Sequence, residues 1–115
     1  MAERVNPITL TDTETGERYT LEFSRETVKF AQNRKFAVGD IGDFPMLLVP
    51  ELFYLSFRMH HKNLSRAQTD KILETDLGGL TKEFIERLLM LYNAPHESLI
   101  RDEDDAGNSK MTVEM

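Results

Sequence analysis

The stretch FPMLLVPELFYLSFRMHH, residues 44–61, restricts the possible folds more than any other part of the chain. Between positions 46 and 59, ten of the fourteen residues are apolar. At about 100° per residue they occupy nearly the whole circumference of a helix, which must then be covered on several sides. The stretch is also shorter than the roughly 20 apolar residues needed to cross a bilayer. We therefore predict a helix over residues 45–61 at the centre of a small domain, with part of its surface left for a partner.

The segment before this helix has the pattern of a β-hairpin. In residues 8–12 and 18–23, apolar side chains alternate with polar ones, and the polar run between them contains Gly16. We therefore predict a hairpin over residues 8–23. Because an isolated hairpin is only marginally stable in water, it is expected to pack on the helices or on another subunit's sheet. Its unpaired edges predict self-association into a dimer or a ring.

Capping residues and apolar periodicity predict the remaining elements. Ser24, Ser65 and Thr81 each stand where a helix N-cap is expected, and Gly78 follows the last apolar residue of one stretch. Pro50 lies inside the central helix and predicts a kink there, or a later start of that helix. The predicted helices cover residues 25–36, 45–61, 66–77 and 82–101.

These elements predict one α+β domain over residues 1–101, an N-terminal β-hairpin followed by about four helices in a small helical bundle. Residues 102–115 begin with four successive acids and contain no sustained apolar run. Such a segment buries too little apolar surface to offset the entropy of ordering it. We expect an acidic flexible tail, disordered and dispensable for folding, although Met111 and Val113 also fit a short strand that docks on the hairpin.

Composition narrows the class of protein. The chain has 20 acidic and 14 basic residues, a net charge of −6 and no cysteine. Broad nucleic-acid binding is disfavoured, because it depends on neutralising phosphates. Disulfides, cysteine-based zinc sites and thiol catalysis are excluded. The first residues, MAERVNPITL, have no apolar core of a signal peptide, so a soluble intracellular protein is expected.

No motif indicates catalysis or metal binding. His60 and His61 are adjacent and would point about 100° apart on a helix, so they cannot both face one ion. The acidic run from Asp102 begins like a calcium loop but has Ala106 and Val113 where ligands are required. The serines lie in no recognisable nucleophile motif. We therefore predict no catalytic, cofactor or metal residues, and a protein that is not an enzyme.

A cluster of basic residues around the end of the central helix, including Arg58, Lys62 and Arg66, allows several interpretations. It could meet an acidic partner or RNA. It could equally complement the negative end of a helix dipole or attract the acidic tail of the same chain. The lack of a glycine-rich phosphate loop or an aromatic-interleaved basic strand disfavours nucleic acid.

The whole sequence resembles a family of small proteins encoded among the tail genes of siphophages and prophages of Gram-positive bacteria. The resemblance lies in the hairpin ITLTDTETGERYTLEFSRETVKFAQ, the segment DFPMLLVPELFYLSFRMHH, the turn TDKILETDLGGL and the ending KMTVEM, and covers about residues 8–115. Proteins of this size and gene position are similar to tail assembly chaperones. The resemblance implies binding to the long, apolar tape measure protein in the host bacterial cytoplasm until tail tube subunits displace the chaperone. It also implies that some copies carry a frameshifted C-terminal extension that recruits tube subunits.

The residues expected to bind this partner lie on the apolar central helix. The proposed set is Met46, Leu47, Val49, Phe57 and Met59. Neither a cofactor nor a membrane is expected to take part. Two other classes remain open: a structural component of the tail or connector that self-associates through the hairpin, and a host-directed inhibitor that covers a basic surface.

Overall fold

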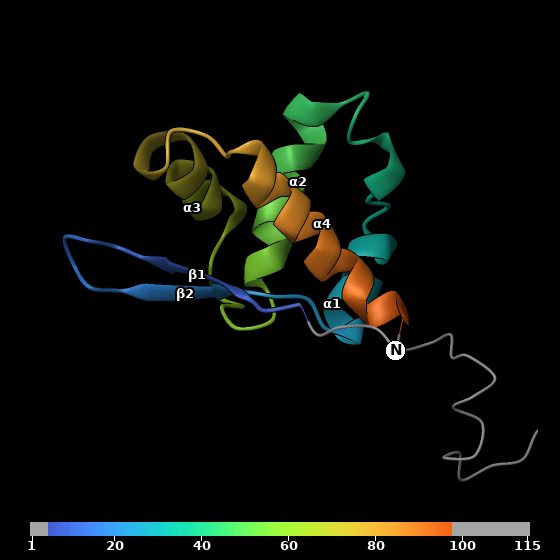
Figure 1. Cartoon of the computed structure of the whole chain (residues 1–115), viewed down its shortest axis with the longest axis horizontal. Coiled ribbons are helices and arrows are strands. Elements are labelled where there is room, and N and C mark those ends of the chain that lie inside the picture. Colours follow the sequence, from blue (N-terminus) through green and yellow to red (C-terminus); the bar gives the residue numbers. More distant parts are fainter. Residues whose placement is uncertain (1–4, 98–115) are drawn as a thin grey trace, which may run out of the picture.

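The structure, a computed structural model, describes residues 5–97 and has an N-terminal antiparallel hairpin followed by four α-helices (Figure 1). This is the predicted α+β arrangement. The predicted acidic tail, residues 102–115, lies outside the described residues. The elements are β1 (Ile8–Thr11), β2 (Arg18–Leu21), α1 (Arg25–Asn33), the short 3-10 helix η1 (Val38–Asp40), α2 (Pro45–Phe57), α3 (Arg66–Lys71), the π-helical segment η2 (Ile72–Asp76) and α4 (Lys82–Glu97).

The hairpin pairs β1 with β2 in a register that places Ile8 opposite Leu21 and Leu10 opposite Tyr19. These four apolar side chains therefore share one face of the two-stranded sheet, as the alternation predicted. Leu21 is fully buried, and the other three are half-buried against the core. The base of the hairpin thus packs on the helices, and Figure 1 shows its turn projecting away from them.

Helix α2 is the centre of the core. Leu52, Phe53, Leu55 and Phe57 are each at most 1% exposed. The ring of Phe57 contacts Phe53 at a centroid distance of 4.9 Å and Tyr19 of the hairpin at 5.7 Å, both edge to face. The central position predicted for this helix is confirmed over its C-terminal half.

A second aromatic group joins the remaining elements. The Tyr92 ring of α4 lies 5.3 Å from Phe23, which follows β2, and 5.6 Å from Phe36, which follows α1. All three side chains are buried. Edge-to-face pairs of this kind add specific geometry to the area that they bury. They fix α4 against the start and the end of α1.

The predicted caps are confirmed, and they explain where the helices begin. The Ser24 hydroxyl accepts the Thr27 N–H, and Ser65 forms a capping box with Gln68. The Thr81 hydroxyl accepts the Phe84 N–H at 3.1 Å. Each side-chain oxygen satisfies a backbone donor that the first turn of a helix leaves free.

Helix α1 ends at Asn33, three residues before the predicted end. Lys35 adopts φ 61°, a left-handed conformation that cannot continue an α-helix. The Phe36 N–H then donates to the Ala31 carbonyl at 3.0 Å, which closes the helix and turns Phe36 into the core. Because this conformation is normally a role for glycine, the sequence did not indicate the earlier end.

Helix α2 ends at Phe57, whereas the prediction extended it to residue 61. Beyond it the backbone tightens: the Arg58 N–H donates to the Leu55 carbonyl at 3.2 Å and the His60 N–H to the Phe57 carbonyl at 3.3 Å, each three residues earlier. Both histidines then reach the hairpin: His61 Nε2 accepts the Thr20 N–H, and His60 Nε2 lies 2.9 Å from a Glu22 carboxylate oxygen. These contacts with the hairpin favour a non-helical backbone here over a continuation of α2.

The third predicted helix, residues 66–77, is divided between α3 and η2. The Leu77 N–H donates to the Ile72 carbonyl, five residues earlier, at 2.8 Å, which is a π-type bond. Gly78 and Gly79 both have positive φ, so the predicted glycine stop is confirmed. Helix α4 is described as far as Glu97, and residues 98–101 of the prediction lie outside the described part.

Two of the four prolines lie within continuous helices. Pro50 is inside α2 and Pro95 inside α4, so α2 does not begin at Pro50, the alternative that its position had left open. None of the helices in residues 5–97 combines the length and the apolarity that a membrane span requires.

Candidate protein-binding surface

The first turn of α2 exposes large apolar side chains. Phe44 at the N-cap is 55% exposed, Met46 87% and Leu47 69%. The next two residues, Leu48 and Val49, are half-buried. We call the exposed group Phe44, Met46 and Leu47 the apolar end of α2. In Figure 1 it lies at the end of the helix away from the hairpin. Exposed apolar side chains are common singly, whereas three that are nearly consecutive make this turn a candidate contact surface.

Local sequence explains why this turn projects from the core. The preceding loop is closed by η1 and by the Phe44 N–H, which donates to the Asp40 carbonyl at 2.9 Å. Pro45 starts the helix, where its missing N–H costs nothing. Pro50 lacks the N–H that would bind the Met46 carbonyl, four residues earlier. With no side-chain cap on Phe44 either, the turn is held by fewer bonds than an ordinary first turn.

The structure separates the five residues predicted to bind a partner. Met46 and Leu47 lie on the apolar end of α2, and Val49 is half-buried beside them. Phe57 is 1% exposed and belongs to the core, so its assignment to an exposed surface was wrong. Met59 is 37% exposed but follows the opposite end of the helix, about 20 Å along its axis. The five residues therefore do not form one patch.

Phe44 was missing from the predicted set, although its neighbours were included. The signal that could have found it is its position immediately before Pro45, because Pro favours the first helical position and so places Phe44 at the N-cap. Phe57 was misplaced because the all-round apolar pattern gives no direction to the core. Position 57 is buried because the ring of the hairpin residue Tyr19 covers Phe57.

Beyond the apolar end, α2 is tied to α1 and α3 by ion pairs. The Glu51 carboxylate accepts from Arg34 at 2.8 Å and from Arg66 at 2.7 Å, and Arg66 also binds Asp70 at 2.9 Å. The Arg34 guanidinium lies 5.5 Å from the centre of the Tyr54 ring. These contacts hold the middle of α2 in place. Its exposed first turn extends from this anchored part of the helix.

The basic cluster at the end of α2 is largely occupied by partners in the same chain. Arg58 stacks over the Phe30 ring at 3.7 Å, and Arg66 binds the carboxylates of Glu51 and Asp70. His61 contacts Thr20 of β2, and His60 contacts Glu22 just after that strand. These side chains therefore no longer support the interpretation of the cluster as a free basic surface. Within residues 5–97, no group of three or more potential ligands could hold a metal ion.

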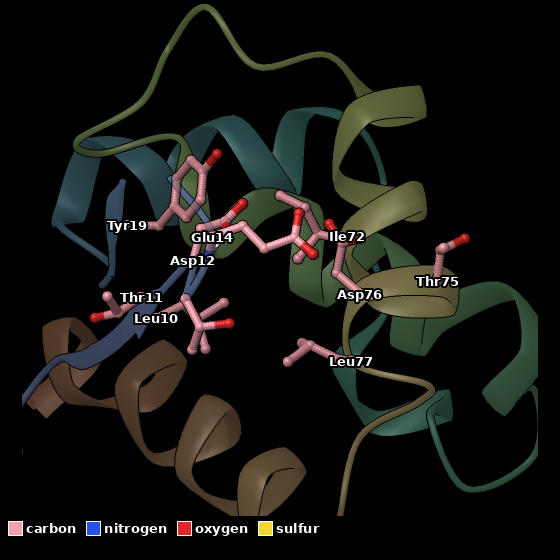
Figure 2. Close-up of a pocket in the computed structure, with 10 residues that line it drawn as sticks. Leu10, Thr11, Asp12, Glu14, Tyr19, Ile72, Thr75, Asp76 and Leu77 are labelled. Atoms are coloured by element: carbon pink, nitrogen blue, oxygen red, sulfur yellow. Dashed lines mark hydrogen bonds between the residues drawn. The ribbon is translucent and has the colours of Figure 1, made fainter. Parts of the chain in front are cut away.

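Figure 2 shows an open hollow of about 420 Å³ between the hairpin turn and η2, with Asp12 and Glu14 on one side and Asp76 and Leu77 on the other. Asp12 accepts the backbone N–H groups of Glu14 and Thr15, and these bonds hold its pKa below the usual value. The carboxylate is thus engaged in the hairpin turn, which is a structural role.

Tyr19 lines the same hollow. Burial raises the pKa of its phenol, and the hydrogen bond and negative charge of Glu17, with the charges of Asp12 and Asp76, raise it further. A phenol held in its neutral form next to carboxylates is a hydrogen-bond donor rather than a nucleophile. The hollow therefore presents the carboxylates of Asp12, Glu14 and Asp76 beside a neutral phenol.

The hydroxyls of the described serines are engaged with the backbone. Ser24 and Ser65 cap helices, and the Ser56 hydroxyl donates to the Phe53 carbonyl at 2.6 Å. Ser98 and Ser109 lie outside the described residues. The geometry thus assigns Ser24, Ser56 and Ser65 to the fold.

Comparison with known proteins places the chain in a family. No curated protein and no solved structure matches it. One family profile matches residues 1–115, the whole sequence. The chain therefore belongs to the family described as "Domain of unknown function (DUF5055)".

Proposed function

We propose that this protein is a phage tail assembly chaperone that binds the apolar tape measure protein and helps to recruit tail tube subunits. The observation that carries the proposal is the apolar end of α2, which holds Met46 at 87% and Leu47 at 69% exposure on a helix whose C-terminal half is in the core. The resemblance to tail-region proteins of siphophages supplies the class of client.

The chemistry of the surface suits a helical client. A tape measure helix carries apolar stripes that would aggregate in water, and helix-in-groove contacts bury such stripes against another apolar surface. Met46 is unbranched and flexible, so it can adapt to varied client side chains. Phe44 and Leu47, 55% and 69% exposed, add further apolar surface next to it in the sequence.

The charge of the molecule suits the same role. Its net charge of −6 would keep a client coated with many copies dispersed by mutual repulsion. Many copies along one long client would each need only modest affinity. The activity requires neither cofactor nor nucleotide and takes place in the host bacterial cytoplasm.

The test is co-expression of a tape measure segment with the wild-type protein, with Leu47→Glu, and with Met90→Glu. Met90 is 53% exposed on α4 and outside the apolar end, so it is the matched control. Wild type and Met90→Glu should keep the segment soluble, whereas Leu47→Glu should not, with circular dichroism showing an intact fold in all three. Equal precipitation with and without the wild-type protein would refute the chaperone function.

A second candidate function is a structural component of the tail or connector that self-associates through its hairpin. The exposure of Thr9 and Thr11 on β1, a strand at the edge of the sheet, favours it. Gene neighbourhood distinguishes the two. A slippery heptamer upstream of an overlapping reading frame, followed by a very long tape measure gene, supports the chaperone.

A further inference from the structure

The two edges of the hairpin differ in what they bind. On the outer edge of β2, the Thr20 N–H donates to His61 Nε2 at 2.9 Å, and just beyond the strand the Glu22 N–H donates to the Ser56 carbonyl at 2.9 Å. The edge of β2 is therefore covered by the end of α2 and the turn that follows it. No further strand can pair there without displacing these bonds.

Among the described residues, nothing covers the outer edge of β1. Thr9 pairs with Thr20 and Thr11 with Arg18. In an antiparallel sheet, two directly opposed residues either both point their N–H and C=O groups into the space between the strands or both point them away from it, and these two kinds of pair alternate along the strands. Since the Thr20 N–H points outward, the backbone N–H and C=O groups of Thr9 and Thr11 point outward as well. Both residues are exposed, and no group in residues 5–97 is recorded as bonding to this edge.

We propose that β1 pairs with β1 of a second copy of this chain, antiparallel and with Leu10 facing Leu10 of the second copy. In this register Thr9 of each copy exchanges both backbone hydrogen bonds with Thr11 of the other. The result is a four-stranded sheet across a two-fold axis. The inference rests on the hairpin and is independent of the proposed binding to a client through α2.

The sequence selects this register over its neighbours. A shift that centres the axis on Thr9 places Pro7, which has no N–H, opposite Thr11. A shift that centres it on Thr11 places Thr13, in the hairpin turn, opposite Thr9. With the axis at Leu10, all of the paired residues lie within β1.

Charge complementarity favours a second copy and an antiparallel orientation. The hairpin tip carries the carboxylates of Asp12, Glu14 and Glu17, whereas β1 itself is uncharged. In the proposed register, the acidic tip of each copy extends toward the start of β1 in the other copy. There Arg87 donates to the Asn6 carbonyl at 3.4 Å, so a guanidinium is present at the base of β1. A parallel arrangement would instead bring the two acidic tips together.

The chain has no cysteine, so single cysteines can report the register directly. In a directly opposed non-hydrogen-bonded pair the Cα atoms are about 4.5 Å apart, within the range of a disulfide. Leu10→Cys should therefore cross-link to a dimer under mild oxidation. Thr9→Cys is the matched control, because its two copies lie on a diagonal about 8 Å apart, beyond the usual limit. Equal cross-linking of the two variants would overturn the proposed register.

Sedimentation across a concentration series tests the pairing itself. Thr9→Pro removes an outward N–H at a site where an edge strand tolerates Pro, and should leave the protein monomeric at concentrations where wild type dimerises. Thr13→Pro is the control: it follows the Asp that begins the turn, a position that favours Pro, and should dimerise as wild type does. If the wild-type protein stays monomeric at high micromolar concentration, the proposal is overturned. This holds even if β1 of that monomer binds an unrelated extended peptide.

Discussion

Single residues of α2 separate into those that build the core and those that are available for contact, although their chemistry is similar. Phe57 and Leu47 are both large and apolar, yet their exposures are 1% and 69%. Phe57 is enclosed by Phe53, Tyr19 and the turn at His61. Leu47 lies in the first turn, outside the region that the hairpin and the other helices cover.

Alanine substitutions at these two positions should therefore differ strongly. Phe57→Ala should lower the free energy of unfolding by about 3–5 kcal/mol, because it removes a buried ring and leaves a cavity. Leu47→Ala should change it by less than about 0.5 kcal/mol, as is usual for exposed sites. Urea denaturation measures both. Similar losses at the two positions would show that the first turn of α2 is also part of the core.

At the scale of elements, the end of α2 and the edge of β2 depend on each other. His61 Nε2 can accept the Thr20 N–H only while that nitrogen carries no proton. Burial lowers the pKa of His61, and the charge of the neighbouring His60 lowers it further, against a smaller opposing effect of Glu17. The folded protein thus binds this proton less readily than the unfolded chain does. Stability from His61 is present above its unfolded pKa and is lost as the pH falls through the folded pKa.

Unfolding should accordingly require less urea at about pH 5.5 than at about pH 7.5, because His61 ionises over this range in the unfolded chain. His61→Gln keeps an acceptor for the Thr20 N–H but cannot titrate, so its pH dependence should be smaller than that of the wild type. An identical pH dependence in the two proteins would show that His61 does not couple the helix end to the hairpin.

The sequence allowed the elements to be predicted better than their ends. Alternation in the hairpin and the caps at Ser24, Ser65 and Thr81 are local signals, and the structure has them as predicted. The end of α1 depends on a lysine in a left-handed conformation, and the end of α2 on contacts with a strand far away in sequence. The candidate surface was predicted only in part, because periodicity cannot orient a helix that is apolar on every side.

At the scale of the whole molecule, the two proposed contacts lie on separate elements. The apolar end of α2 lies away from the hairpin, while β1 presents its open edge on the hairpin itself (Figure 1). A dimer formed through β1 would leave both copies of α2 free, so that one assembly could hold a client at two points and gain avidity. The proposed self-association and the proposed client binding are therefore compatible in one assembly.

The most direct test of the proposed client binding is the affinity of a labelled tape measure helix for the purified protein, measured by fluorescence anisotropy. The double variant Met46→Glu/Leu47→Glu should bind at least about tenfold more weakly than wild type, a loss of about 1.4 kcal/mol. Met90→Glu carries a new charge outside the proposed surface and should bind within about twofold of wild type, about 0.4 kcal/mol. Equal affinities for the double variant and the wild type would contradict the assignment of the apolar end of α2 as the client-binding surface.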